Sequence, residues 1–352
     1  MFDLGRLVGA NRITCAMLFF TIAFYAAVLL ADRAATVSAP AAKANALKAA
    51  ELDRQTMKSR EAAFIENIKS KPGLITAVSL AASLVLLAGL VLSFYFAVRG
   101  LKGSPPIAAE FSHSQARWGL REVVQVFVFL FFIEALILSL ESLLYFVAGF
   151  EPIEKDVFLI SNSLFRDLFT AGLVVYLVKV KFGQPASELG LTTSHFFKNV
   201  ATGLVGYVTI VPALVLTLAA ISWGMQRFSY EPPPQAVVQI YLKDSTRPFL
   251  VQLTFFVAVL GPIIEEIFFR GFTYKAFRTR FGVGRAMVLT ALIFAALHMS
   301  VAAMLPIFLL GLFLTYLYEK TGSLVPSMTV HVLHNLIMVA LTLGFKSLAG
   351  QA

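Results

Sequence analysis

The chain has few of the charged residues that soluble domains place at their surface. Asp, Glu, Lys and Arg make up 14% of its 352 residues, against about 25% in an ordinary soluble domain. Hydrophobic residues account for 58%, in runs too long and continuous for the strands of a membrane barrel. The composition therefore predicts an all-α, polytopic transmembrane helical bundle.

Cysteine is nearly absent, and histidine is scarce. A single cysteine, Cys15, excludes a disulfide framework or a cysteine-based zinc site within one chain. The net charge of +9 suggests nucleic acid as a partner. We reject that interpretation, because basic residues between membrane spans serve orientation and contact with anionic lipid head groups. The expected surroundings are a lipid bilayer.

Nine apolar runs come near the ~20 residues that a helix needs to cross a bilayer. They are approximately 13–31, 74–98, 122–147, 164–181, 199–223, 249–269, 286–303, 305–319 and 324–345. The first run follows two arginines and resembles a signal peptide. At about 19 residues it exceeds the usual apolar core of a signal peptide, so we expect a retained membrane helix.

We expect three regions along the chain. Residues 1–118 form an N-terminal pair of spans with a polar helical loop at 32–72, and residues 119–248 supply further helices of the bundle. Residues 249–346 form the third region, a membrane domain whose apolar runs contain charged residues and histidines. Within the second region, the loop 226–248 contains three consecutive prolines and is predicted to be extended and exposed.

The distribution of Lys and Arg predicts the orientation. With the N-terminus inside, the cytoplasmic side carries 15 of these residues and the short loops of the other side carry 6, with 8 more in the long first loop. Short loops dominate the positive-inside rule, which favours N-terminus in and C-terminus out. The compact, Ala-rich chain is typical of bacteria, so we expect a multi-pass protein of the bacterial cytoplasmic (inner) membrane.

Three charged residues interrupt the apolar run Leu260–Gly271, which reads L-G-P-I-I-E-E-I-F-F-R-G. Ionisable groups in lipid are costly and mark functional sites. Glu266 and Arg270 are four residues apart, so they share a helix face and can neutralise each other. Glu265 is turned about 100° away and has no local partner. Its partner is expected to come from another part of the chain.

Three histidines lie in the final apolar runs. His298 ends the sequence F-A-A-L-H, one helical turn after Phe294, and the last run contains H-V-L-H-N. His331 and Asn335 are four residues apart on one face, and His334 is turned away from them. If these faces meet Glu265, they form a polar, water-accessible catalytic pocket between the late helices.

Such a pocket supports two kinds of chemistry. A carboxylate in apolar surroundings is suited to take a proton from water, which Glu265 would do with His298. His331 and Asn335 would then donate hydrogen bonds to an oxyanion. Alternatively, Glu265, His298 and His331 supply the three ligands of a catalytic zinc ion. There is no H-E-x-x-H pairing, so zinc and a metal-independent glutamate mechanism remain equal alternatives.

The three motifs together resemble those of the CPBP family of intramembrane proteases. This family comprises type II CAAX prenyl endopeptidases and bacterial relatives that process bacteriocins or confer immunity. Its pattern, E-E-x-x-x-R, F-x-x-x-H and H-x-x-x-N in order, is matched by Glu265–Arg270, Phe294–His298 and His331–Asn335. The resemblance covers about the last 100 residues, and the N-terminal pair of spans with its long loop departs from it.

The resemblance implies an intramembrane endopeptidase, possessing either a metalloprotease or a metal-free glutamate mechanism. Glu265 and His298 would activate water, His331 and Asn335 would stabilise the oxyanion, and Glu266, Arg270 and Phe294 would support the site. The implied partner is a membrane-associated or lipid-modified protein or peptide. Two alternatives use the same polar pocket, namely a non-catalytic membrane immunity or scaffold protein and a proton- or ion-coupled transporter. The sequence has no internal repeat to favour a transporter.

Two further glutamates lie in an apolar run. Glu134 and Glu141 are seven residues apart and nearly share a face. They either line the substrate cavity or bind a cation, or they are simply packed against Arg166 or a neighbouring helix. The packing interpretation is favoured.

Overall fold

The computed structural model describes residues 12–38, 40–103, 107, 116–148, 155–230, 232, 235–243 and 246–350, and in these residues every regular element is a helix. The α-helices are α2 (Arg12–Ser38), α3 (Pro40–Lys69), α4 (Pro72–Leu101), α5 (Leu120–Ala148), α6 (Lys155–Tyr176), α7 (Phe196–Arg227), α8 (Ala236–Leu242), α9 (Arg247–Phe255), α10 (Gly261–Glu266), α11 (Lys275–Phe281), α12 (Val283–Leu297), α13 (Val301–Thr321) and α14 (Leu324–Leu348). Three π-helical segments, Leu177–Lys181, Phe256–Leu260 (η3) and Ile267–Tyr274 (η4), and a 3-10 turn, Ala186–Leu189 (η2), complete the set. The predicted all-α fold is confirmed.

Seven helical stretches in the described part of the chain are long and apolar enough to cross a membrane. They are Ile13–Ala31, Pro72–Leu101, Leu120–Leu144, Phe196–Arg227, Arg247–Phe281, Val301–Thr321 and Leu324–Leu348. Helices suit this role because they satisfy every backbone hydrogen bond within the segment, where lipid offers none. The protein is thus an integral, multi-pass membrane protein.

Two of the nine predicted spans are absent from these seven. The run 164–181 comprises the second half of α6 and the π-helical segment Leu177–Lys181, and its first turn contains the charged residues Arg166 and Asp167. The run 286–303 is divided, because α12 has only 15 residues and ends at Leu297. At 1.5 Å per residue α12 is about 22 Å long, less than the ~30 Å hydrocarbon core of a bilayer.

The predicted span 249–269 is part of a longer composite helix, Arg247–Phe281. Two π-helical segments, η3 and η4, lie directly before and after the short α-helix α10. Single π-helical turns inside α-helices are rare and occur frequently at functional sites. The pattern of apolar residues does not distinguish these segments from a regular α-helix.

The loop expected at 226–248 is partly helical and buried. Within it, α8 buries Ile240, Tyr241 and Leu242, so the prediction of an extended, exposed loop is wrong there. Three apolar side chains in one short helix have outweighed the effect of the nearby prolines. The helix expected in the first polar loop is present as α3.

The described chain divides into two compact units. Unit 1 comprises residues 1–77, 124–166 and 341–352, and unit 2 comprises residues 78–123 and 167–340. In unit 1, Phe20 of α2 packs edge-on against Phe132 of α5 at a centroid distance of 5.4 Å. Near the chain end, the amide of Asn67 donates to the carbonyl oxygen of Leu348 over 2.9 Å. The three regions expected from the sequence stay a prediction.

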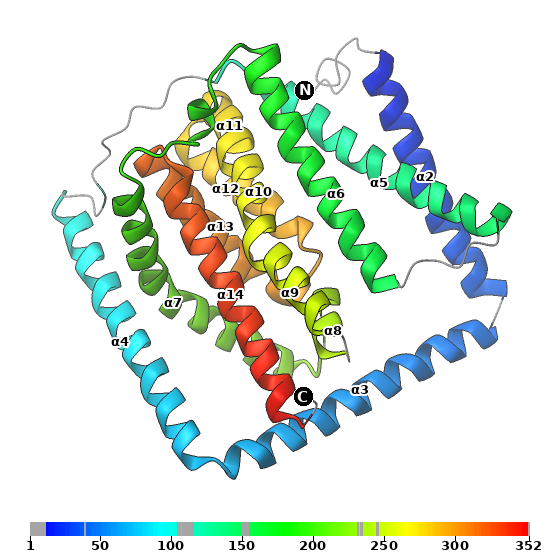
Figure 1. Ribbon diagram of the computed structural model, residues 1–352, viewed down its shortest axis with the longest axis horizontal. Coiled ribbons are helices and arrows are strands. Elements are labelled where there is room, and N and C mark those ends of the chain that lie inside the picture. The colour runs from blue at the N-terminus through cyan, green and yellow to red at the C-terminus, as the bar shows by residue number, and fades with distance from the viewer. Residues whose placement is uncertain are drawn as a thin grey trace. The chain divides into compact units, whose positions relative to one another are not determined.

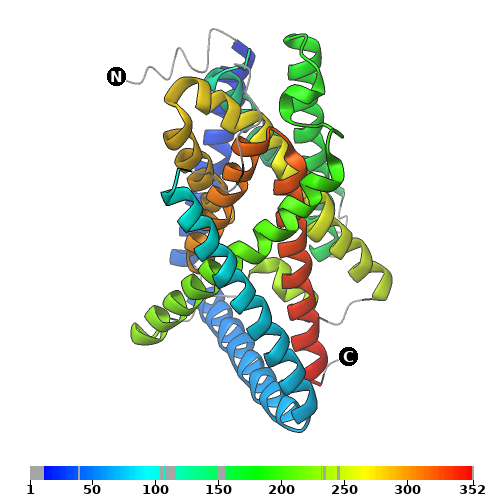
Figure 2. The same ribbon diagram turned by 90° about the vertical axis from the view of Figure 1, so that its left-hand side faces the viewer.

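The core of unit 2 is built from α7, α13 and α14. Its fully or nearly buried members are Tyr207, Leu214, Leu310, Leu314, Leu317 and Val330. Helix α12 packs against α13, and α14 is one continuous helix in both views of the molecule (Figures 1 and 2). This core holds α14 in place, and α14 carries the H-V-L-H-N motif.

Gly203 allows α7 and α14 to approach closely. A Cβ atom at Gly203 would lie 2.6 Å from the Cβ of Thr329 and 2.8 Å from the carbonyl oxygen of Pro326. We expect Gly203→Ala to lower the free energy of unfolding by about 1–3 kcal/mol, because backbone atoms of α14 must move. Thermal unfolding of the purified protein in detergent measures the effect.

Gly224 in the same helix is the matched control, since no atom lies within 4 Å of the position that a Cβ would take there. Gly224→Ala should leave stability unchanged or raise it by up to about 1 kcal/mol, because alanine is the better helix former. Equal stability of the two variants would contradict close packing at Gly203.

Candidate active site

Glu265 and Glu266 lie at the end of α10, directly before the π-helical segment η4. Glu266 is completely buried, as is Arg270 one turn later. Arg270 donates from Nη1 to Oε1 of Glu266 over 2.6 Å, so the ion pair that the spacing predicts is present. Its burial matters, because a buried charge is tolerated only when it is paired and hydrogen-bonded.

The pair is extended by His331 from α14. His331 is 3% exposed, and its Nδ1 lies 3.0 Å from the same Oε1 atom of Glu266. A carboxylate can only accept a hydrogen bond, so Nδ1 carries the proton and donates. This fixes the tautomer of the imidazole and turns Nε2 away from Glu266.

Glu265 lies on the other side of the same imidazole. Its Oε2 is 3.7 Å from Nε2 of His331, and its side chain is 32% exposed. Arg270, Glu266, His331 and Glu265 thus form a continuous series, buried at one end and accessible at the other. The series is electrically neutral overall when His331 is protonated.

Phe294 of α12 joins the histidines to this series. Its ring packs edge-on against His298 at 4.7 Å and against His331 at 5.7 Å between centroids. The guanidinium carbon of Arg270 lies 4.4 Å from the centre of the same ring, within the range of a cation–π interaction. One buried aromatic ring therefore contacts three of the side chains that the sequence singled out.

His298 lies in the turn between α12 and α13, whereas the sequence placed it within a membrane span. Met299 has a φ of 51°, and Ser300 caps α13 by accepting from the backbone N–H of Ala303. The ring of His298 is held because Nδ1 donates to the carbonyl oxygen of Phe294 over 2.8 Å. Its Nε2 is thereby the acceptor nitrogen of a neutral imidazole.

Asn335 is bound to the backbone of the composite helix. Its amide donates to the carbonyl oxygen of Val257 over 3.0 Å. Gly261 donates its N–H to Phe256, and the next residue, Pro262, has no N–H to offer. The carbonyl of Val257 therefore lacks its regular helical donor, and Asn335 supplies one from α14.

Sequence reasoning missed two of these supports. The carbonyl of Gly311 in α13 accepts from Nη2 of Arg270 over 3.3 Å. Because Pro262 has no N–H, the carbonyl of Val257 is left to accept from Asn335. The sequence signal for the contact between Asn335 and Val257 is Pro262, a proline within a predicted span, together with a polar residue in another span. A glycine carbonyl gives no sequence signal.

The remaining predicted residues lie outside the series. His334 is 3.4 Å from the hydroxyl of Tyr207 through its Nδ1. Glu134 accepts from Asn162 over 3.1 Å and lies 3.6 Å from Arg166, so the packing interpretation of Glu134 is confirmed. Glu141 is partly buried on the same helix, α5.

The described residues contain no group of three or more His, Cys, Asp or Glu side chains arranged to hold a metal ion. In the predicted zinc set, Nδ1 of His331 is bound to Glu266, and Nδ1 of His298 is bound to a backbone carbonyl. These bonds leave Nε2 of both rings free, as in histidines that ligate a metal, so the choice between zinc and a metal-independent glutamate mechanism stays a prediction.

A helical membrane protein with a carboxylate–histidine site between its late helices is the class that these observations define. Residues 247–337 match the model of a known family, described as type II CAAX prenyl endopeptidase Rce1-like. This segment contains every residue of the series, and the match confirms the resemblance to CAAX proteases that the motifs indicate. Neither the curated proteins nor the solved structures contain a match.

The buried ion pair generates a test of stability. We expect Arg270→Ala to lower the free energy of unfolding by about 3–5 kcal/mol, because it leaves the buried carboxylate of Glu266 without its cation. Thermal unfolding in detergent measures this loss. Arg280→Ala is the control, because Arg280 is exposed on α11, and it should change stability by less than about 0.5 kcal/mol. An unchanged melting temperature for Arg270→Ala would disprove the structural role of the pair.

Proposed function

We propose that the chain is an intramembrane endopeptidase that hydrolyses a peptide bond of a membrane-associated or lipid-modified protein or peptide. The family match supports a CAAX-type protease in general. The observation that carries the specific proposal is the partly exposed Glu265 beside the buried series of His331, Glu266 and Arg270. The carboxylate of Glu265 is accessible to water, and the buried ring of His331 lies beside it.

Glu265 is the general base in this proposal. It takes a proton from a water molecule, whose oxygen attacks the carbonyl carbon of the scissile peptide bond. Nε2 of His298 accepts a hydrogen bond from the other hydrogen of this water and orients it. When the tetrahedral intermediate collapses, the C–N bond breaks and Glu265 returns the proton to the leaving nitrogen.

His331 and Asn335 stabilise the oxyanion. Protonated His331 donates from Nε2, while Glu266 accepts from its Nδ1 and holds the ring in place. The amide of Asn335 carries two hydrogens, and one is already donated to Val257. The second is available to the oxyanion. Removing a single oxyanion donor in other hydrolases costs about 10²–10³ in kcat.

The substrate class follows from where the site lies. All four proposed catalytic residues belong to helices, or to a turn between helices, of the membrane-spanning region. A peptide bond must therefore come to the bilayer, either in a membrane protein or in a peptide carrying a lipid. The name of the matching family refers to a prenylated CAAX substrate, which is one member of this class.

Glu265→Gln tests the proposed base. Glutamine keeps the shape of glutamate but cannot take a proton, so we expect hydrolysis to fall about 10²–10⁴-fold. Comparing the membrane proteomes of cells that express the wild type or this variant should reveal an uncleaved precursor in the variant cells alone. The variant should melt at the wild-type temperature, since Glu265 is partly exposed.

Glu141→Gln is the matched control, another partly buried glutamate in an apolar helix, and it should process the precursor as the wild type does. Cleavage by Glu265→Gln at near wild-type rate would refute the assignment of the base. A phenotype rescued equally by wild type and by a Glu265→Ala, His298→Ala double variant would instead indicate a non-catalytic immunity or scaffold protein.

A further inference from the structure

Two threonine hydroxyls inside unit 2 are buried without a hydrogen bond. Thr273 lies in η4 and Thr290 in α12, and both side chains are completely buried. Among the residues that the structure describes, neither hydroxyl oxygen has a hydrogen-bond partner. The large majority of buried polar side-chain atoms in proteins bind another protein group or an ordered water, so both threonines are exceptions.

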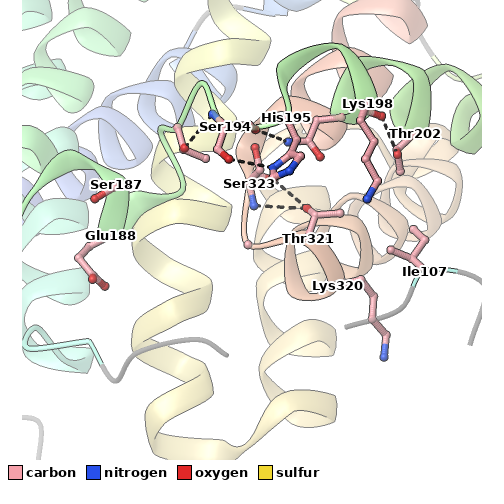
Figure 3. Close-up of a pocket in the computed structure, with 13 residues that line it drawn as sticks. Ile107, Ser187, Glu188, Ser194, His195, Lys198, Thr202, Lys320, Thr321 and Ser323 are labelled. Atoms are coloured by element: carbon pink, nitrogen blue, oxygen red, sulfur yellow. Dashed lines mark hydrogen bonds between the residues drawn. The ribbon is translucent and has the colours of Figure 1, made fainter. Parts of the chain in front are cut away.

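Other helical threonines of the chain bind their own backbone. Thr202 and Thr321 line a polar pocket between the first turns of α7 and the end of α13 (Figure 3). Each of their hydroxyls donates to the carbonyl oxygen four residues earlier over 2.8 Å, which is the usual local bond of threonine in a helix. Within the described part of the chain, Thr273 and Thr290 do not make this bond. Their hydroxyls are therefore available to another group.

The two threonines lie opposite each other. The composite helix and α12 pack against each other in opposite directions, with Gly282 between them in the sequence. The rings of Phe269 and Phe294 meet across this interface at a centroid distance of 5.1 Å. Thr273 lies four residues after Phe269. Thr290 lies four residues before Phe294, so both threonines are one turn from the ring contact and on the same side of it.

A water molecule matches the chemistry of this pair. Each hydroxyl is both a donor and an acceptor, so one water can donate to the first and accept from the second. Internal waters in proteins bind otherwise unsatisfied buried polar groups in this way. The neighbouring buried positions carry small side chains, Ala276 after Thr273 and Ala286 before Thr290. Polar groups that face each other without a direct bond are commonly joined by such a water.

We propose that Thr273 and Thr290 bind an internal water molecule that bridges the composite helix and α12. Glu265 lies eight residues before Thr273, and His298 lies eight residues after Thr290. The bridge therefore joins the two helices that lead to these residues, at the same distance along the chain from each. It holds the spacing of the two helices at a point where neither threonine binds its own backbone. This inference goes beyond the proposed proteolysis and does not rest on it.

Replacing one threonine by valine tests the bridge, because valine has nearly the shape of threonine and lacks the hydroxyl. Thr273→Val and Thr290→Val should each lower the melting temperature of the full chain in detergent by about 2–6 °C, since the water and the remaining hydroxyl lose a partner. An unchanged or raised melting temperature in either variant would overturn the proposal, because removing a hydroxyl that binds nothing relieves a cost.

The double variant Thr273→Val, Thr290→Val removes both polar groups at once. Replacing both partners by apolar groups of the same shape is nearly neutral, so its melting temperature should lie within about 2 °C of the wild type. Thr329 supplies the control, because its hydroxyl donates to the carbonyl of Val325 over 2.8 Å. The shifts of Thr273→Val and Thr329→Val should simply add. Additive losses for Thr273→Val and Thr290→Val would overturn the shared water.

X-ray footprinting with mass spectrometry detects the water itself. Irradiation converts a bound water to a hydroxyl radical, which oxidises the side chains beside it even when they are buried. Phe277 lies one turn after Thr273 and is 5% exposed, so we expect its oxidation in the wild type and a several-fold fall in the double valine variant. Phe281, which is partly exposed, should be oxidised equally in both. Equal oxidation of Phe277 in the two proteins would overturn the proposal. None of these measurements depends on proteolysis.

Discussion

The ion pair between Glu266 and Arg270 is the constraint on which the site depends. Two full charges, completely removed from solvent, must be matched closely or the fold loses several kcal/mol. The match extends beyond the pair, because His331 donates to the same carboxylate oxygen and the carbonyl of Gly311 accepts from the guanidinium. The composite helix, α13 and α14 are therefore held in one relative position by polar contacts.

This arrangement separates structural and chemical roles within one run of side chains. Glu266 is inaccessible, and its Oε1 atom is bound to both Arg270 and His331. Glu265, the preceding residue, is partly exposed and faces the far nitrogen of His331. Phe294 adds an apolar support, since its ring contacts Arg270, His298 and His331. A preorganised site of this kind needs little rearrangement when charge develops on a substrate.

Much of this arrangement could be predicted from sequence. Spacing gave the pairing of Glu266 with Arg270, because residues four apart on a helix must be neighbours. Hydropathy predicted the all-α membrane fold, because few structures other than helices can cross a lipid bilayer. The contact between Glu134 and Arg166 also followed from the need to pair a charge in an apolar helix.

Other features depend on contacts that periodicity does not encode. The end of α12 before His298 is decided by the backbone of Met299 and by the cap that Ser300 provides. The buried helix α8 lies in a segment whose prolines predict an open loop. The two π-helical segments change the number of residues per turn without changing the composition, so an apolar pattern cannot reveal them.

The hydrogen bond between Asn335 and Val257 has a consequence for how variants of the site are interpreted. Asn335 completes the backbone of a helix interrupted by Pro262, and it is also the proposed donor to the oxyanion. An activity lost with this side chain therefore mixes a catalytic effect with the loosening of the helix that carries Glu265. In kinetic terms, Asn335 and Glu265 form one coupled unit, and the effects of replacing them separately will not add.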